Sequence, residues 1–293
     1  MQKTQQKLSS LCKTCPRNCH VDRTFSVGFC KENFTIRIAK IIEHFKWEEP
    51  CVTGDNGALA IFFSGCNLRC DYCQNYQISR GGVGKEYSLD EFVSLIEEKQ
   101  KTHDYIDLIT PTHFSNALVQ AFSKINKTIP VVWNTNSYET TQNIEKVSEF
   151  VDIFLADLKY GNNELGREFS VCENYFDYAL PAIKKMCQLK PDIIQDDLMQ
   201  QGVIIRHLVL PDHIDNSINV LNIINDNFPT RKISVMSQFT PNGKSKLNRR
   251  LRPIEYKAVL THMQSLELSN GYVQEINSAS DNFVPDFDST SPI

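Results

Sequence analysis

The sequence predicts an α/β protein in which a partial (β/α)6 barrel follows a small N-terminal leader rich in cysteine. From residue 58 onward, short apolar or β-branched runs alternate with longer amphipathic segments. This alternation is typical of repeated βα units around a parallel sheet. Before that point, prolines and glycines interrupt any long periodic element. We therefore expect a cysteine-rich metal-binding leader at 1–55, and a core barrel with a C-terminal tail at 56–293.

Each expected strand is a short apolar run, and each expected helix has an apolar face with a period near 3.6. The strands are predicted at 58–64, 105–110, 130–134, 152–157, 203–210 and 232–237. The helices are predicted at 89–101, 115–126, 139–150, 174–189, 215–227 and 253–268. Ser88 and Glu91 form a capping box for the first helix, and Pro253 suits the first turn of the last. Ligands should gather at the C-terminal ends of the strands, although periodicity alone also permits an open doubly wound sheet.

The composition indicates a soluble cytoplasmic protein. The net charge is -4 and the pI is about 6.0, so no global charge favours nucleic acid or a membrane surface as a partner. The N-terminus, MQKTQQKLSSLC, lacks the apolar core of a signal peptide. In a reducing compartment, clustered cysteines are more often metal ligands or catalytic groups than disulfides.

A group of three cysteines directly follows the first predicted strand, in the segment SGCNLRCDYCQN. Cys66, Cys70 and Cys73 lie close enough in sequence for one loop to wrap around an iron-sulfur cluster. Three thiolates leave one metal position without a protein ligand, which distinguishes a reactive centre from a closed structural one. A structural zinc ion requires four ligands, and no fourth is evident nearby.

The leader carries four further potential ligands, in CKTCPRNC and the following GFC. Four thiolates suit a structural zinc site or a second 4Fe-4S cluster, and the sequence leaves both open. Arg17 is expected to be solvated. The leader ligands are Cys12, Cys15, Cys19 and Cys30. The isolated Cys51, Cys172 and Cys187 are expected to be buried thiols.

The central motif, Cys-x3-Cys-x-aromatic-Cys with Tyr72 as the aromatic residue, resembles that of the radical S-adenosylmethionine (SAM) superfamily. The resemblance implies a 4Fe-4S cluster whose open iron chelates SAM, with Tyr72 beside the adenine. It also implies reductive cleavage of SAM to methionine and a 5′-deoxyadenosyl radical. Such chemistry belongs to the cofactor, while the protein positions it.

The similarity extends over almost the whole chain and looks like an uncharacterised branch of proteins similar to pyruvate formate-lyase activating enzymes. The segments that carry it include EEPCVTGDNGALAIFFSG, LITPTHF, VVWNTNSYE, DIFLADLKYG, IIRHLVLP and VMSQFTP. The chain departs from the family pattern at one place. Most of the superfamily has a GGE-type segment after strand 2, whereas this chain has Thr110 and its neighbours there, without a carboxylate. The resemblance implies that Tyr72, Asp157, Lys159 and Arg206 contact SAM. Asn134 and Asn136, at the end of the third predicted strand, are placed to hydrogen-bond it, and Thr110 is the candidate after the second strand.

This resemblance leads us to expect a radical SAM oxidoreductase that activates or modifies a protein or peptide, as glycyl-radical activases do. An electron donor such as flavodoxin or ferredoxin is the expected reductant. Two alternatives remain open: radical modification of a small molecule or nucleoside, and an iron-sulfur electron-transfer or sensor protein. His113 and His207 are as consistent with hydrogen bonding at the barrel rim as with acid-base catalysis.

Overall fold

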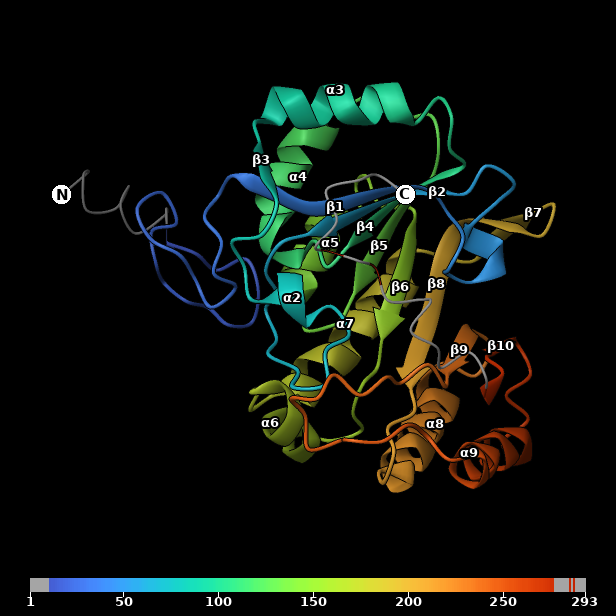
Figure 1. Ribbon diagram of the computed structural model, residues 1–293. Coiled ribbons are helices and arrows are strands. Elements are labelled where there is room, and N and C mark those ends of the chain that lie inside the picture. Colours follow the sequence, from blue (N-terminus) through green and yellow to red (C-terminus); the bar gives the residue numbers. More distant parts are fainter. Residues whose placement is uncertain (1–10, 277–284, 286, 288–293) are drawn as a thin grey trace.

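The computed structural model describes residues 11–276, 285 and 287, and it contains one twisted mixed sheet with helices packed on its outer side (Figure 1). The strands are β1 Ile36–Phe45, β2 Ala58–Phe63, β3 Lys85–Tyr87, β4 Tyr105–Ile109, β5 Val131–Thr135, β6 Ile153–Asp157, β7 Ile193–Gln195, β8 Leu198–Leu208, β9 Lys232–Met236 and β10 Gly271–Val273. Their order is β10-β9-β8-β6-β5-β4-β2-β1-β3, with β7 added to β8. Because β10 and β3 end this path without pairing to each other, the described sheet forms an open barrel.

The central strands are buried on both faces, which explains why their sequences are nearly continuous hydrophobic runs. All six residues of β2 are buried. Leu59, Ile61 and Phe63 pack in the cluster beneath the helices. Ala58, Ala60 and Phe62 alternate with them and belong to a second cluster inside the barrel. Since successive side chains of a strand point to opposite faces, one strand contributes to both cores.

The expected βα order is confirmed. The six predicted strands correspond to β2, β4, β5, β6, β8 and β9, which pair in parallel. Six predicted helices are also present, most of them shorter than expected, and the capping box of Ser88 with Glu91 and the N-terminal Pro253 are both confirmed. The α-helices are α2 Tyr76–Ser79, α3 Leu89–Lys99, α4 Ser115–Phe122, α5 Thr141–Val147, α6 Asn163–Ser170, α7 Tyr175–Leu189, α8 Ile214–Asn227 and α9 Pro253–Ser265. Short 3-10 helices are η1 Pro50–Val52 and η2 Thr112–Phe114.

The expectation that residues 1–55 contain no long regular element is wrong. Residues 36–45 form β1, which pairs antiparallel with β2 and with β3. Ile36, Ile38 and Ile42 are buried, so this part of the predicted leader shares the core of the barrel. The short elements α2, α6, β3, β7 and β10 were not predicted either, because runs of three to eight residues carry little periodicity.

The cysteine-bearing part of the leader packs against the barrel through arginines. Arg23 is fully buried and donates to the carbonyls of Glu32 at 3.1 Å and His113 at 2.5 Å. Arg17 donates to the carbonyl of Asn67 at 2.7 Å, and its guanidinium lies over the ring of Phe29. The expected solvated role of Arg17 is therefore wrong. Among the described helices, none has both the length and the apolar character needed to cross a membrane.

Candidate functional site

A cleft opens at the C-terminal ends of the parallel strands, and it brings together every residue predicted for the central site. Because strands that run in parallel end at the same edge of the sheet, residues far apart in sequence meet there. The predicted residues that line the cleft are Cys66, Cys70, Tyr72, Cys73, Thr110, Asn134, Asn136, Asp157, Lys159 and Arg206. The cleft also has an apolar wall that includes Leu68, Met236 and Phe239.

The cysteine loop leaves β2 through Gly65, which has a φ of 81°. A Cβ at this position would lie 2.5 Å from the carbonyl oxygen of Cys30, so glycine permits the leader to approach the loop closely. Cys66 accepts hydrogen bonds at its sulfur from the backbone of Leu68 at 3.3 Å and from Asn136 Nδ2 at 3.4 Å. Such N–H donors help to set the potential of an iron-sulfur cluster.

A chain of hydroxyl groups supports the second cysteine. Cys70 Sγ lies 2.9 Å from Ser170 Oγ, which lies 2.7 Å from the hydroxyl of Tyr160. Tyr160 in turn contacts the hydroxyl of Tyr72 at 2.8 Å. Ser170, the last residue of α6, therefore contacts the thiol directly and the motif's aromatic residue through Tyr160.

Burial disfavours the ionised form of the motif cysteines. Burial raises the pKa of Cys66 to about 11 and that of Cys70 to about 12. A metal binds the thiolate, so loading the site must release protons. Without a metal these thiols are protonated, and they are therefore poor nucleophiles.

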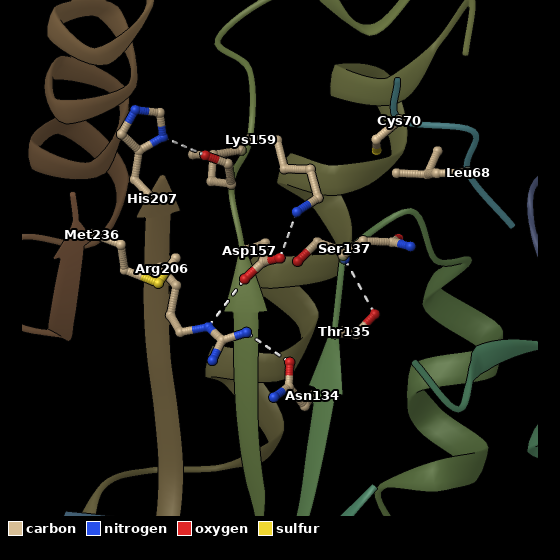
Figure 2. A network of polar contacts seen from close by, with 12 residues as sticks. Leu68, Cys70, Asn134, Thr135, Ser137, Asp157, Lys159, Arg206, His207 and Met236 are labelled. Carbon is tan, nitrogen blue, oxygen red and sulfur yellow. Dashed lines mark hydrogen bonds and ion pairs between the residues drawn. The ribbon is translucent and has the colours of Figure 1, made fainter. Parts of the chain in front are cut away.

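An ion-pair network forms one wall of the cleft (Figure 2). Asp157, at the end of β6, accepts from Lys159 Nζ at 2.6 Å and from Arg206 Nε at 3.0 Å. Arg206 also donates to Asn134 Oδ1 at 2.6 Å. Burial raises the pKa of Asp157, but Lys159 and Arg206 outweigh that effect and hold it below its usual value. Asp157 is therefore ionised at neutral pH, between two cations.

Glu48 is a member of this network that sequence reasoning missed. It accepts from Arg206 Nη1 at 2.6 Å and from Asn134 Nδ2 at 3.0 Å. Burial raises its pKa to about 7, although the charge of Arg206 opposes this shift. The segment that begins EEPC carried the family resemblance, but nothing in its pattern indicated that it passes inside the barrel.

Replacement of Glu48 by Gln should make the protein more stable in alkaline buffer. The folded state holds a proton on Glu48 up to about pH 7, whereas the unfolded chain loses it near its usual pKa. Stability contributed by this proton is therefore present at low pH and is lost as the pH rises through the folded pKa. Urea unfolding should give the variant a higher midpoint than wild type at pH 8 and a similar one at pH 5. Equal midpoints at pH 8 would contradict the assignment.

The region after β4 lacks a carboxylate on the cleft, as the sequence indicated. Thr110, which has a φ of 59°, lines the cleft and its backbone donates to the carbonyl of Asn134. Asp107 lies deeper, inside the barrel, where burial raises its pKa well above the usual value. Burial lowers the pKa of His113 to about 3 and that of His207 to about 4. Both histidines are buried and neutral, so they serve as hydrogen-bonding residues.

The four leader cysteines lie in one small unit beside the cleft. Three of them, Cys12, Cys15 and Cys30, are buried, and Cys19 is half-buried. A Cβ at Gly28 would lie 3.4 Å from the sulfur of Cys19 and 3.7 Å from that of Cys30. Elsewhere, the isolated cysteines Cys51 and Cys172 are buried as expected, and Cys187 is half-buried.

The three thiols of the central loop suit a 4Fe-4S cluster. Cys66, Cys70 and Cys73 all line the cleft. In a cubane each thiol binds a different iron, so three thiols leave one iron without a protein ligand. The residues present thus fit a three-thiol 4Fe-4S site.

Comparisons with known proteins agree with the geometry. Residues 60–220 match the family model of the radical SAM superfamily. The chain is 32% identical over 275 residues to an uncharacterised protein of Methanocaldococcus jannaschii, which covers 89% of this chain and 75% of that protein.

Two solved structures of SuiB from Streptococcus suis share the fold. The structure bound to S-adenosylmethionine has a TM-score of 0.54 and 11% identity, and covers 76% of this chain and 52% of SuiB. The structure bound to the precursor peptide SuiA has a TM-score of 0.53 and 11% identity, and the match covers 78% of this chain and 51% of SuiB. This chain thus spans about half the length of SuiB. Together with the three-cysteine loop at the end of β2, the family match shows that the chain belongs to the radical SAM superfamily.

Proposed function

We propose that this protein reductively cleaves SAM at a 4Fe-4S cluster and uses the resulting 5′-deoxyadenosyl radical to abstract hydrogen from a protein or peptide. One observation carries the proposal. Three thiols and a set of charged and amide side chains meet in one cleft, and no fourth cysteine lines it among the described residues. A cluster bound by three thiols keeps one iron available to a ligand.

The side chains around the cleft suit a ligand that carries both charges. Lys159 and Arg206 offer cationic donors toward a carboxylate. Asp157, and Glu48 when it is ionised, offer acceptors toward an amine or a sulfonium. The amides of Asn134 and Asn136 add neutral donors and acceptors, and Tyr72 and Thr110 complete the proposed SAM site. When bound, the cluster supplies one electron to the sulfonium. A donor such as flavodoxin or ferredoxin then returns an electron to the cluster.

The proposed substrate is a protein or peptide. The resemblance to glycyl-radical activating enzymes supports a protein substrate, and one structure with this fold is of SuiB with a precursor peptide. Classical activases lack the cysteine leader, so radical modification of a small molecule or nucleoside remains the second candidate. We also propose that Cys12, Cys15, Cys19 and Cys30 bind a metal, either a zinc ion or a second 4Fe-4S cluster.

Isotope transfer tests the function and the substrate together. The protein is reconstituted with iron and sulfide without oxygen, reduced, and assayed for 5′-deoxyadenosine with SAM. Deuterated cell extract is then divided into polypeptide and small-molecule fractions. Deuterium should enter 5′-deoxyadenosine from the polypeptide fraction. Label from the small-molecule fraction alone would favour the second candidate, and failure to cleave SAM under any of these conditions would reject the radical proposal.

A further inference from the structure

Two histidines and a glutamate meet at the end of the barrel opposite the cleft. Glu43 and His44 lie near the end of β1, and His103 lies just before β4 begins. One ligand atom from each of the three residues lies within 4.8 Å of the other two. No other three His, Cys, Asp or Glu residues of the described chain satisfy this spacing.

A bulge in β1 creates this arrangement. The pairing of β1 with β2 shifts register between Ile42 and Phe45, and His44 adopts a left-handed φ of 56°. This conformation costs a non-glycine residue about 1–2 kcal/mol. Gly57 packs so closely against the bulge that a Cβ there would lie 2.5 Å from the carbonyl carbon of His44. The neighbouring backbone therefore holds His44 in a strained position, beside the loop that carries His103.

Hydrogen bonds to the backbone leave the same nitrogen free on both histidines. His44 Nδ1 lies 2.7 Å from the carbonyl oxygen of Asn56, and His103 Nδ1 lies 2.8 Å from that of Lys99. Because a carbonyl oxygen accepts only, each Nδ1 donates to it, and in the neutral ring Nε2 then keeps the lone pair. Metal-binding histidines are oriented by backbone carbonyls in the same way.

His103 supplies a second, independent observation that points to a ligand. Its side chain is buried, with 4% of the residue exposed, and its Nε2 has no hydrogen-bond partner among the described residues. A buried polar atom without a partner costs about 1–3 kcal/mol. The ring stacks on that of His44, with centroids 4.6 Å apart and an angle of 19° between the planes. One ring must therefore turn out of this stack for the Nε2 atoms of both histidines to reach one cation.

Glu43 supplies the third donor. Its Oε1 accepts from Lys99 Nζ at 2.6 Å, so Oε2 is the oxygen available to a metal. We propose that Glu43, His44 and His103 bind a divalent first-row transition metal, such as zinc. Two imidazoles and a carboxylate are a known zinc ligand set, with water in the remaining position. The ion would join the bulge of β1 to the loop before β4, and thereby stabilise the base of the barrel.

Zinc binding to the reconstituted protein, with its cysteines already occupied by iron-sulfur clusters, tests this proposal. The affinity of the site for zinc should be at least tenfold higher in wild type than in the variant His44→Asn. Wild type should therefore take up about one more zinc ion per chain than the variant. Asparagine tolerates the left-handed backbone, so the exposed His44 can be replaced without a new strain. X-ray absorption at the zinc edge should show nitrogen and oxygen ligands.

A matched substitution controls for general effects of losing a histidine. His262, in α9, contacts Asn222 at 2.8 Å and lies outside the proposed site. The variant His262→Asn should bind zinc as wild type does. Zinc should also raise the melting temperature of wild type but not that of His44→Asn. Equal zinc uptake by wild type and His44→Asn, or a sulfur shell around the added zinc, would overturn the proposal.

Discussion

Replacement of Cys70 by Ala should reduce the formation of 5′-deoxyadenosine from SAM to the level seen without protein. The variant loses one of three thiols that fit the cluster, and two thiols cannot hold a cubane with a single open iron. Ser170, whose hydroxyl lies 2.9 Å from Cys70 Sγ, offers only a neutral hydroxyl in place of the lost thiolate. Anaerobic reconstitution, reduction and chromatography of the nucleoside product measure the effect.

Cys187→Ala provides the matched control, because Cys187 is another half-buried thiol but lies in α7, away from the cleft. This variant should form the nucleoside at the wild-type rate. Metal bound by the leader should persist in Cys70→Ala, since its ligands belong to a separate segment. Nucleoside formation by Cys70→Ala above background would show that the three-thiol assignment is wrong.

Much of the barrel could be predicted because each central strand is buried on both faces. The run ALAIFF of β2 is apolar at every position, so its hydrophobicity alone identifies a buried strand. In contrast, the run IRIAKIIEHF of β1 contains Lys40 and a bulge, which break the alternation. Its partners β2 and β3 are also set by long-range pairing, which no local pattern specifies.

The cleft was predictable for a related reason. Parallel strands bring their ends together, so polar residues that follow apolar runs converge whatever their separation in sequence. Asn134, Asp157 and Arg206 meet in this way. Glu48 does not follow a strand of the parallel sheet, and its place depends on the path of the chain between β1 and β2. The site was therefore predictable where the fold repeats, and unpredictable where an irregular segment enters the barrel.

Arg206 should matter most for stability, because it is the buried cation that the network shares. Arg206→Met would leave Glu48 without its cationic partner and Asp157 with Lys159 alone. Removing one partner of a buried ion pair typically costs about 3–5 kcal/mol, since the remaining charge stays desolvated. Urea unfolding at pH 8 should show a loss of this size. The loss should shrink at pH 5, where Glu48, with a folded pKa of about 7, is protonated in both proteins.

The planar guanidinium gives Arg206 a role that a positive charge alone does not supply. Arg206 uses three nitrogens to reach Asp157, Glu48 and Asn134 at once, and a lysine ammonium cannot match this planar fork. Arg206→Lys should therefore recover little of the lost stability and little SAM cleavage. Arg167→Met, which breaks an exposed pair with Glu173, should unfold like wild type, because water screens that pair. If Arg206→Met were as stable as Arg167→Met, the buried network around Arg206 would contribute nothing measurable to the free energy of unfolding.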